Sequence, residues 1–227
     1  MRLRFLGHSC FHLMTEQGEL LFDPYLSGNP LATVTAEQIT ADAILVSHGH
    51  SDHLGDAISI SKRLEIPIVA AFELAIYCEQ KGAQTHAMHI GGDHTFSFGW
   101  VKLTPAWHGS SVLEGERIIY TGQPCGFLVR SGGQTIYFAG DTGLFGDMEL
   151  LGDMYDIDLA LLPIGGNFVM GIEDAARAAK MLRPRVVVPM HYNTFDLIKQ
   201  DPEEFAHRLQ ALRVDCRILE PGESTEI

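Results

Sequence analysis

A short stretch near residue 50 contains four side chains that can bind a divalent metal ion. It reads His48-Gly49-His50-Ser51-Asp52-His53, so three imidazoles and one carboxylate fall within six residues. Side chains alternate along an extended segment, so His48 and His50 can point to the same side. Gly49 between them permits a tight turn. Imidazole nitrogens and carboxylate oxygens suit zinc, manganese, iron or nickel, so the stretch predicts a metal site.

Three further candidate ligands stand at the ends of short apolar runs, as the first stretch does. The run at residues 43–46 leads into His48, and similar runs lead into His108, Asp141 and His191. Loops at strand ends are where rigid scaffolds place functional groups, so we expect four strands to deliver these side chains to one edge. The seven candidate ligands are His48, His50, Asp52, His53, His108, Asp141 and His191. None is a cysteine, which disfavours a closed structural zinc site and favours a catalytic one.

The rest of the chain predicts strands in excess of helices. Continuous apolar runs, typical of strands buried on both faces, occupy residues 3–6, 10–14, 20–22, 66–71, 95–98, 101–103, 126–129, 135–138, 159–162 and 186–188. Helical patterns occupy residues 57–64, 73–81, 172–182 and a segment that begins at Asp201. No linker or repeat interrupts them, so we expect one domain over residues 1–227, with helices covering the outer faces of the sheets.

Composition narrows the function classes. The chain has 227 residues, and 16 basic against 29 acidic residues give a net charge of −13. This balance disfavours binding to nucleic acids or anionic membranes, which need a basic surface. No apolar run is long enough to span a membrane, and residues 1–13 lack the apolar core of a signal peptide, so we expect a cytoplasmic protein. The four cysteines are far apart, as buried reduced thiols would be.

These motifs resemble those of the metallo-β-lactamase superfamily. His48-x-His50-x-Asp52-His53 matches its signature motif, and His108, Asp141 and His191 match its later ligand motifs in the same order. Within the superfamily, the chain is most similar to a bacterial and archaeal group of uncharacterised metal-dependent hydrolases, with ascorbate-phosphate lactonases as more distant neighbours. That closer similarity is carried by residues 6–9, 104–108, 137–147 and 188–195.

The resemblance implies a fold and a ligand arrangement. The fold would be α+β, an αββα sandwich of two mixed sheets with helices on both outer faces. One metal ion would take His48, His50 and His108, a second would take Asp52, His53 and His191, and Asp141 would bridge them. A shared hydroxide would then be the nucleophile, with Asp52 and Asp141 as the catalytic residues. Zinc is the first choice for both ions, and manganese, nickel or iron are alternatives.

The expected activity is hydrolysis of a phosphodiester, lactone or other ester bond in a small anionic substrate. The alternatives are an iron-dependent oxidoreductase and a non-catalytic metal-binding or sensing protein of the same fold. Self-association stays open. Four residues are candidates for bracing the ligands or touching substrate, against ordinary structural roles: His8, Asp23, Asn167 and Asn193. The group of metal-dependent hydrolases more often has an acidic residue at the position of Gly166. This chain therefore cannot use an acidic side chain there.

Overall fold

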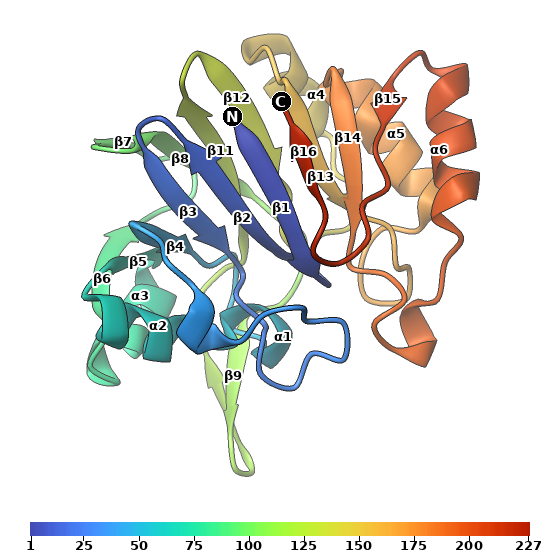
Figure 1. The fold of residues 1–227 in the computed structure, drawn as a ribbon. Helices are drawn as coiled ribbons and strands as arrows, with labels where there is room; N and C mark the ends of the chain where they lie inside the picture. The colour runs from blue at the N-terminus through green and yellow to red at the C-terminus, as the bar shows by residue number, and fades with distance from the viewer.

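Two seven-stranded sheets packed face to face form the centre of the molecule (Figure 1). The computed structural model describes residues 1–227. The strand order is β16-β1-β2-β3-β4-β5-β6 in the first sheet and β15-β14-β13-β12-β11-β8-β7 in the second. Helices lie on the outer faces, which confirms the predicted αββα sandwich.

The first sheet begins as an antiparallel meander and continues as a parallel sheet. β1 (Arg2–Gly7), β2 (Cys10–Thr15) and β3 (Gly18–Phe22) are antiparallel, and the short C-terminal strand β16 (Ser224–Glu226) pairs with β1. β3, β4 (Ala43–Leu45), β5 (Pro67–Ala71) and β6 (Gln84–Met88) are parallel. The outer face is covered by α2 (Ala57–Leu64) and α3 (Phe72–Gln80), which bury a smaller apolar cluster of 17 residues.

The second sheet repeats this plan. β7 (Asp93–Phe96), β8 (Gly99–Pro105), β11 (Cys125–Ser131) and β12 (Gln134–Phe138) are antiparallel. β12, β13 (Leu159–Pro163), β14 (Val186–Met190) and β15 (Asp215–Cys216) are parallel. The helices on this side are α4 (Asp147–Met154), α5 (Ile172–Leu182) and α6 (Pro202–Ala211). None of the six α-helices is both long and apolar enough to cross a membrane.

The main core lies between the sheets and extends under the helices of the second sheet. It contains 45 buried residues, and the rings of Phe22 and Phe138 meet across the interface with their centroids 5.0 Å apart. β4, β13 and β14 are buried along their whole length, as the continuous apolar runs predict. The sheets are therefore a rigid base for the loops at their ends.

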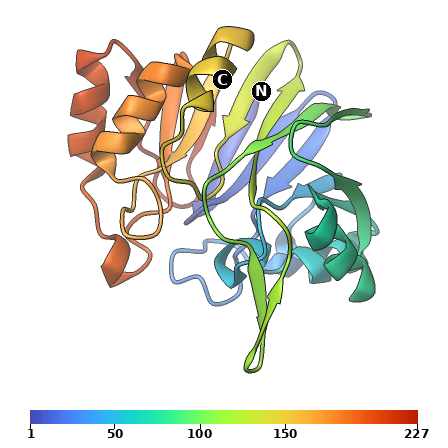
Figure 2. The same cartoon turned by 180° about the vertical axis from the view of Figure 1, so that it is seen from behind.

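A two-stranded hairpin stands outside both sheets. It consists of β9 (Ser111–Glu114) and β10 (Arg117–Tyr120), and it projects from the body of the molecule beside the short helix α1 (Ser51–Leu54) (Figure 2). Two 3₁₀ turns, η1 (Ala36–Gln38) and η2 (Asp196–Ile198), lie in loops.

Most predicted elements are confirmed. The helices predicted at 57–64 and 172–182 match α2 and α5, and the Asp201 side chain accepts a hydrogen bond from the Glu203 backbone N–H at the start of α6. The strand predicted at 95–98 is wrong by two residues, because β7 begins at the exposed Asp93. The sequence did not predict α4, in which Gly152 is required because an added Cβ would lie 2.3 Å from the Met181 carbonyl oxygen.

Candidate metal centre

Four strand ends bring the seven candidate ligands to one edge of the sandwich. The segment with His48 follows β4, and His108, Asp141 and His191 follow β8, β12 and β14. β8 and β12 are each antiparallel to β11, so they run in the same direction. β12, β13 and β14 are parallel. β8, β12 and β14 therefore all end at the same edge of the sheet. The topology thus explains the convergence that the apolar runs predicted.

The first group of ligands consists of three imidazoles. The ligand atoms of His48, His50 and His108 all lie within 4.8 Å of one another. His48 Nε2 lies 3.0 Å from His50 Nδ1, and His48 Nδ1 lies 2.9 Å from the Ser47 hydroxyl. Burial lowers the pKa of all three imidazoles, and that of His48 most strongly. The group is therefore held neutral, the form in which imidazole binds a metal.

The second group contains a carboxylate and lies deeper. The ligand atoms of Asp52, His53, His191 and His8 lie within 4.8 Å of one another. The three imidazoles are buried, whereas Asp52 is partly exposed. Burial alone would raise the pKa of Asp52, but the hydrogen bond with His8 and the charge on His53 bring it well below its ordinary value. Asp52 is therefore ionised, and it is the member of the group that reaches solvent.

Asp141 lies between the two groups. One oxygen, Oδ1, is 3.2 Å from His53 Nε2, and the other, Oδ2, is 3.0 Å from His191 Nε2 and 3.5 Å from His108 Nε2. Its carboxylate thus contacts imidazoles of both groups. Burial would raise the pKa of Asp141, but the nearby His53 and His191 hold it well below its ordinary value.

Asp23 holds His53 from behind. Its Oδ2 accepts a hydrogen bond from His53 Nδ1 at 2.6 Å, and both residues are fully buried. Ser47 fixes the carboxylate in turn, because its backbone N–H donates to Oδ1 at 2.8 Å and its hydroxyl donates to Oδ2 at 2.6 Å. With Nδ1 occupied in this way, Nε2 of His53 is left to face the site, as it would in a metal ligand.

His8 connects Asp52 to the opposite loop. Its Nε2 lies 3.2 Å from Asp52 Oδ2, and its Nδ1 lies 2.8 Å from the Thr194 hydroxyl. Burial lowers the pKa of His8 to about 4, so the imidazole is neutral. It can therefore donate from Nε2 to Asp52 while Nδ1 accepts from Thr194.

The residues present fit divalent metal ions. His53 Nε2 and Asp141 Oδ1 are buried without a hydrogen-bond partner, although they face each other 3.2 Å apart. Burial lowers the pKa of His53, but Asp141 and Asp23 raise it well above its ordinary value. The carboxylates therefore stabilise positive charge among the imidazoles, and a divalent ion supplies such charge. A donor set of nitrogen and oxygen atoms without thiolates suits zinc and its neighbours.

Comparisons with known proteins agree with this geometry. A family model described as Beta-lactamase superfamily domain matches residues 2–191. A protein of Pelotomaculum thermopropionicum named UPF0173 metal-dependent hydrolase is 53% identical over 229 residues, covering 100% of both chains. This chain belongs to the metallo-β-lactamase superfamily. Within it, the chain is a member of the group of metal-dependent hydrolases.

Solved structures show the same superfamily fold. Igni18, a metallo hydrolase from the archaeon Ignicoccus hospitalis, has a TM-score of 0.90 at 38% identity, covering 100% of this chain and 98% of that one. An isothiocyanate hydrolase from Delia radicum gut bacteria has a TM-score of 0.81 at 21% identity, covering 100% and 99% of the two chains. The second likeness shows the fold alone.

Several residues of the candidate site have an unusual backbone conformation. Eight residues other than glycine have a positive φ, and five of them belong to the predicted site: His8, Asp23, Asn167, His191 and Asn193. Such conformations cost of order 1–3 kcal/mol each and persist where the surrounding structure enforces them. The packing around these loops therefore enforces the conformations beside the candidate site.

The two predicted asparagines serve their own loops. Asn193 Oδ1 accepts a hydrogen bond from the Gln200 backbone N–H at 2.9 Å, which closes the loop after His191. Asn167 is exposed in a turn. An added Cβ at Gly166 would lie 3.1 Å from Gln200 Nε2, so an acid there would meet this amide. A substrate contact by either asparagine stays a prediction.

Sequence reasoning missed Ser47 and Thr194. Both are buried hydroxyls that hold the side chains next to the ligands, Asp23 in one case and His8 in the other. Their position beside His48 and within three residues of His191 was a usable signal. Serine and threonine are so common in loops, however, that only the fold identifies the hydroxyls that matter.

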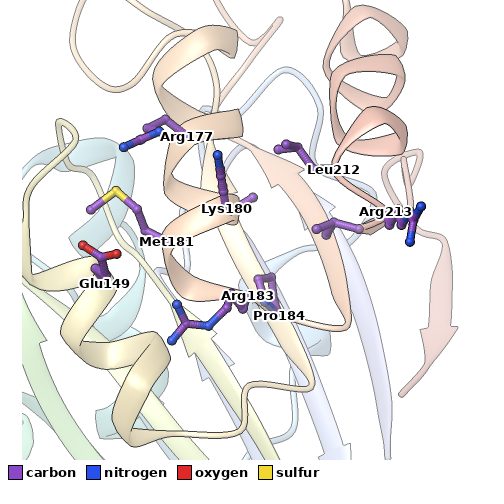
Figure 3. A pocket seen from close by; sticks show the side chains of 10 residues that line it. Glu149, Arg177, Lys180, Met181, Arg183, Pro184, Leu212 and Arg213 are labelled. Atoms are coloured by element: carbon purple, nitrogen blue, oxygen red, sulfur yellow. The ribbon is translucent and has the colours of Figure 1, made fainter.

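Another cavity lies away from the site. It measures about 660 Å³, is lined by residues of α4, α5 and the segment after α6, and contains Arg177, Lys180, Arg183 and Arg213 (Figure 3). The guanidinium group of Arg213 points away from those of Arg177 and Arg183, so the charges do not converge. Lys180 and Arg183 stand at the carboxyl end of α5, where basic side chains stabilise the helix.

Proposed function

We propose that this protein hydrolyses an ester bond at a site that holds two divalent metal ions, with zinc as the first candidate. One observation carries the proposal: two compact groups of ligand atoms lie on either side of Asp141, which contacts both. His48, His50 and His108 would hold one ion, and Asp52, His53 and His191 the other. The relatives named metal-dependent hydrolases support the reaction type.

Bound divalent ions would supply the Lewis acidity that activates a water molecule and polarises the bond to be cleaved. The side chains of the chain have distinct tasks in that reaction. Asp23 fixes the ring orientation of His53 through the 2.6 Å hydrogen bond. Asp141, buried between the groups, keeps their imidazoles in place. Neither group moves far, because the sheets behind them are closely packed.

Asp52 is the carboxylate placed to handle the proton. Its side chain is 27% exposed, and His8 fixes its Oδ2 at 3.2 Å. Hydrolysis joins the oxygen of one water to the carbonyl carbon or phosphorus and breaks the bond to the leaving oxygen. Asp52 accepts a proton from the attacking water, and the leaving oxygen then takes that proton, so no oxidant or reductant is needed.

The test combines metal analysis with a substrate panel. Protein purified without chelator is loaded with zinc, manganese or nickel and assayed on bis(p-nitrophenyl) phosphate, a cyclic nucleotide, a lactone, a thioester and p-nitrophenyl acetate. Two ions per chain and hydrolysis that Asp141→Ala abolishes support the proposal. Fully loaded protein that cleaves no ester contradicts it, and redox-active iron in that protein would favour the oxidoreductase alternative.

Other details stay predictions from the sequence. The cytoplasmic location, the self-association and the anionic substrate are not needed by the arrangement of the site. No lysine or arginine lines the cavity next to His50 and Asp52, so any preference for an anion would come from the metal ions alone.

A further inference from the structure

Exposed apolar side chains surround the metal-binding edge. We call five of them the apolar rim: Trp107, Leu113, Ile118, Phe168 and Phe195. They are between 39% and 77% exposed, although such side chains are normally buried. Trp107 precedes His108, Phe168 is next to Asn167, and the ring of Phe195 lies 5.5 Å from that of His8. The rim therefore follows the loops that carry the site.

Backbone hydrogen bonds connect two of the rim loops. The Gly143 N–H donates to the Trp107 carbonyl at 3.0 Å, and the Met170 N–H donates to the Thr142 carbonyl at 3.0 Å. The loops that carry Trp107 and Phe168 are thus both bonded to the loop after Asp141. The backbones that carry Trp107 and Phe168 are therefore connected through one loop.

The hairpin supplies the other side of the rim. Leu113 pairs with Ile118 across β9 and β10, so both side chains lie on one face of the ribbon. Glu114, which points to the opposite face, accepts a hydrogen bond from the Tyr77 hydroxyl of α3 at 2.7 Å. This contact anchors one face of the ribbon and leaves the Leu113 face open.

The hairpin is also fixed to the metal-binding loop. The Gly49 N–H donates to the Ser110 hydroxyl at 3.1 Å, and that hydroxyl lies 2.7 Å from the Thr121 hydroxyl, across the base of the hairpin. An added Cβ at Gly49 would lie 2.4 Å from Thr121 Oγ1. Because no side chain fits between them, the hairpin keeps a fixed position relative to His48 and His50.

A cavity of about 400 Å³ separates the hairpin from α1. Two of the candidate ligands, His50 and Asp52, line it, and Leu54, Val112 and Leu113 add apolar surface. A volume of this size suits a small organic group. Asp52 is the only lining residue with an acidic or basic side chain apart from histidine, so nothing there would pair with a second charge on a substrate.

We propose that this cavity and the apolar rim bind an uncharged alkyl or aryl group of the substrate, next to the bond that is cleaved. This inference rests on the proposed ester hydrolysis and names its substrate class. Because Asp52 lines the cavity, the reacting carbonyl or phosphoryl group would lie at the candidate ligands while the apolar group extends toward Leu113 and Ile118.

The test uses zinc-loaded protein and the p-nitrophenyl esters of acetate, butyrate, hexanoate and octanoate. We expect kcat/KM to rise by about two- to fourfold for each added methylene group. Leu113→Ser/Ile118→Ser should flatten this rise. The matched control is Leu150→Ser/Met154→Ser, because both side chains are exposed on α4, away from the site.

A binding measurement separates this inference from the proposed function. The uncharged fluorescent probe N-phenyl-1-naphthylamine should bind the unmodified protein and the α4 control, and bind Leu113→Ser/Ile118→Ser at least fivefold more weakly. If no ester is hydrolysed but this difference appears, the ester hydrolysis fails and the apolar site stands. Equal chain-length dependence in all three proteins overturns the inference. So does a dimer in sedimentation that only the hairpin variant loses, since the rim would then be an interface between two copies.

Discussion

The two groups of ligands differ in charge and in support. His48, His50 and His108 are all neutral imidazoles, and two of them are only partly buried. The second group, which consists of Asp52, His53 and His191, includes a carboxylate. Two residues hold this group in place: Asp23 bonds to His53, and His8 bonds to Asp52. A braced, charged group loses less entropy and gains more electrostatic energy when it binds a cation. For the two-ion site proposed above, we therefore expect one tight and one weaker ion position.

The largest effect should come from removing the residue that the two groups share. Asp141→Ala should lower kcat/KM by at least about 1,000-fold, because both groups lose a contact and several kcal/mol of metal-dependent stabilisation depend on them. Circular dichroism should show an unchanged fold, since the sheets do not depend on this side chain. Activity within tenfold of the unmodified protein would mean that Asp141 does not connect the groups.

A chelator should remove the ions of the two groups at different concentrations. When zinc-loaded protein is titrated with dipicolinic acid, we expect two steps that differ at least about tenfold in chelator concentration. The ion held by the three imidazoles should leave first. His50→Ala identifies the steps, because it should abolish the early step and keep the late one. A late step that disappears in His50→Ala would reverse the assignment of the tighter group.

Removing the brace of His53 should weaken the second group alone. In Asp23→Asn, the new amide can donate to Nδ1, which leaves the proton on Nε2 and directs it into the site. We expect the zinc affinity of the second group to fall about 10- to 100-fold and that of the first group to stay unchanged. Isothermal titration calorimetry measures both affinities. An equal loss in both steps would indicate a general disturbance of the loops.

Thr194→Val should give the smallest effect. Valine keeps the shape of threonine but removes the hydroxyl 2.8 Å from His8 Nδ1, so His8 holds Asp52 less firmly. We expect the zinc affinity of the second group to fall two- to fivefold, which corresponds to about 0.5–1 kcal/mol for one neutral hydrogen bond. Thr225→Val, at a half-buried hydroxyl in the C-terminal strand that accepts a hydrogen bond from Arg217, is the control. An unchanged zinc affinity in Thr194→Val would mean that His8 does not orient Asp52 through this contact.

The meeting of the candidate ligands could be predicted from the sequence because they follow strands with continuous apolar runs. β4, β8, β12 and β14 each show an apolar run directly before a ligand, and the structure brings those ends together. The hairpin and α4 could not be predicted in this way. Leu113 and Ile118 are exposed, so no buried face imposes a pattern on β9 and β10.

The supporting contacts also escaped prediction, for a different reason. His8 and Asp52 are 44 residues apart in sequence, and His8 and Thr194 are 186 apart. Only the packing of the two sheets brings such residues together. Asp23 was predicted as a brace from the resemblance, but its hydrogen bonds with Ser47 and His53 needed coordinates.

The most direct test of the account is a count of zinc ions per folded chain by native mass spectrometry. The account predicts two ions in the unmodified protein under saturating zinc, one in His50→Ala, and one in Asp52→Ala. A single ion in the unmodified protein, or two in each variant, would contradict the two-group site.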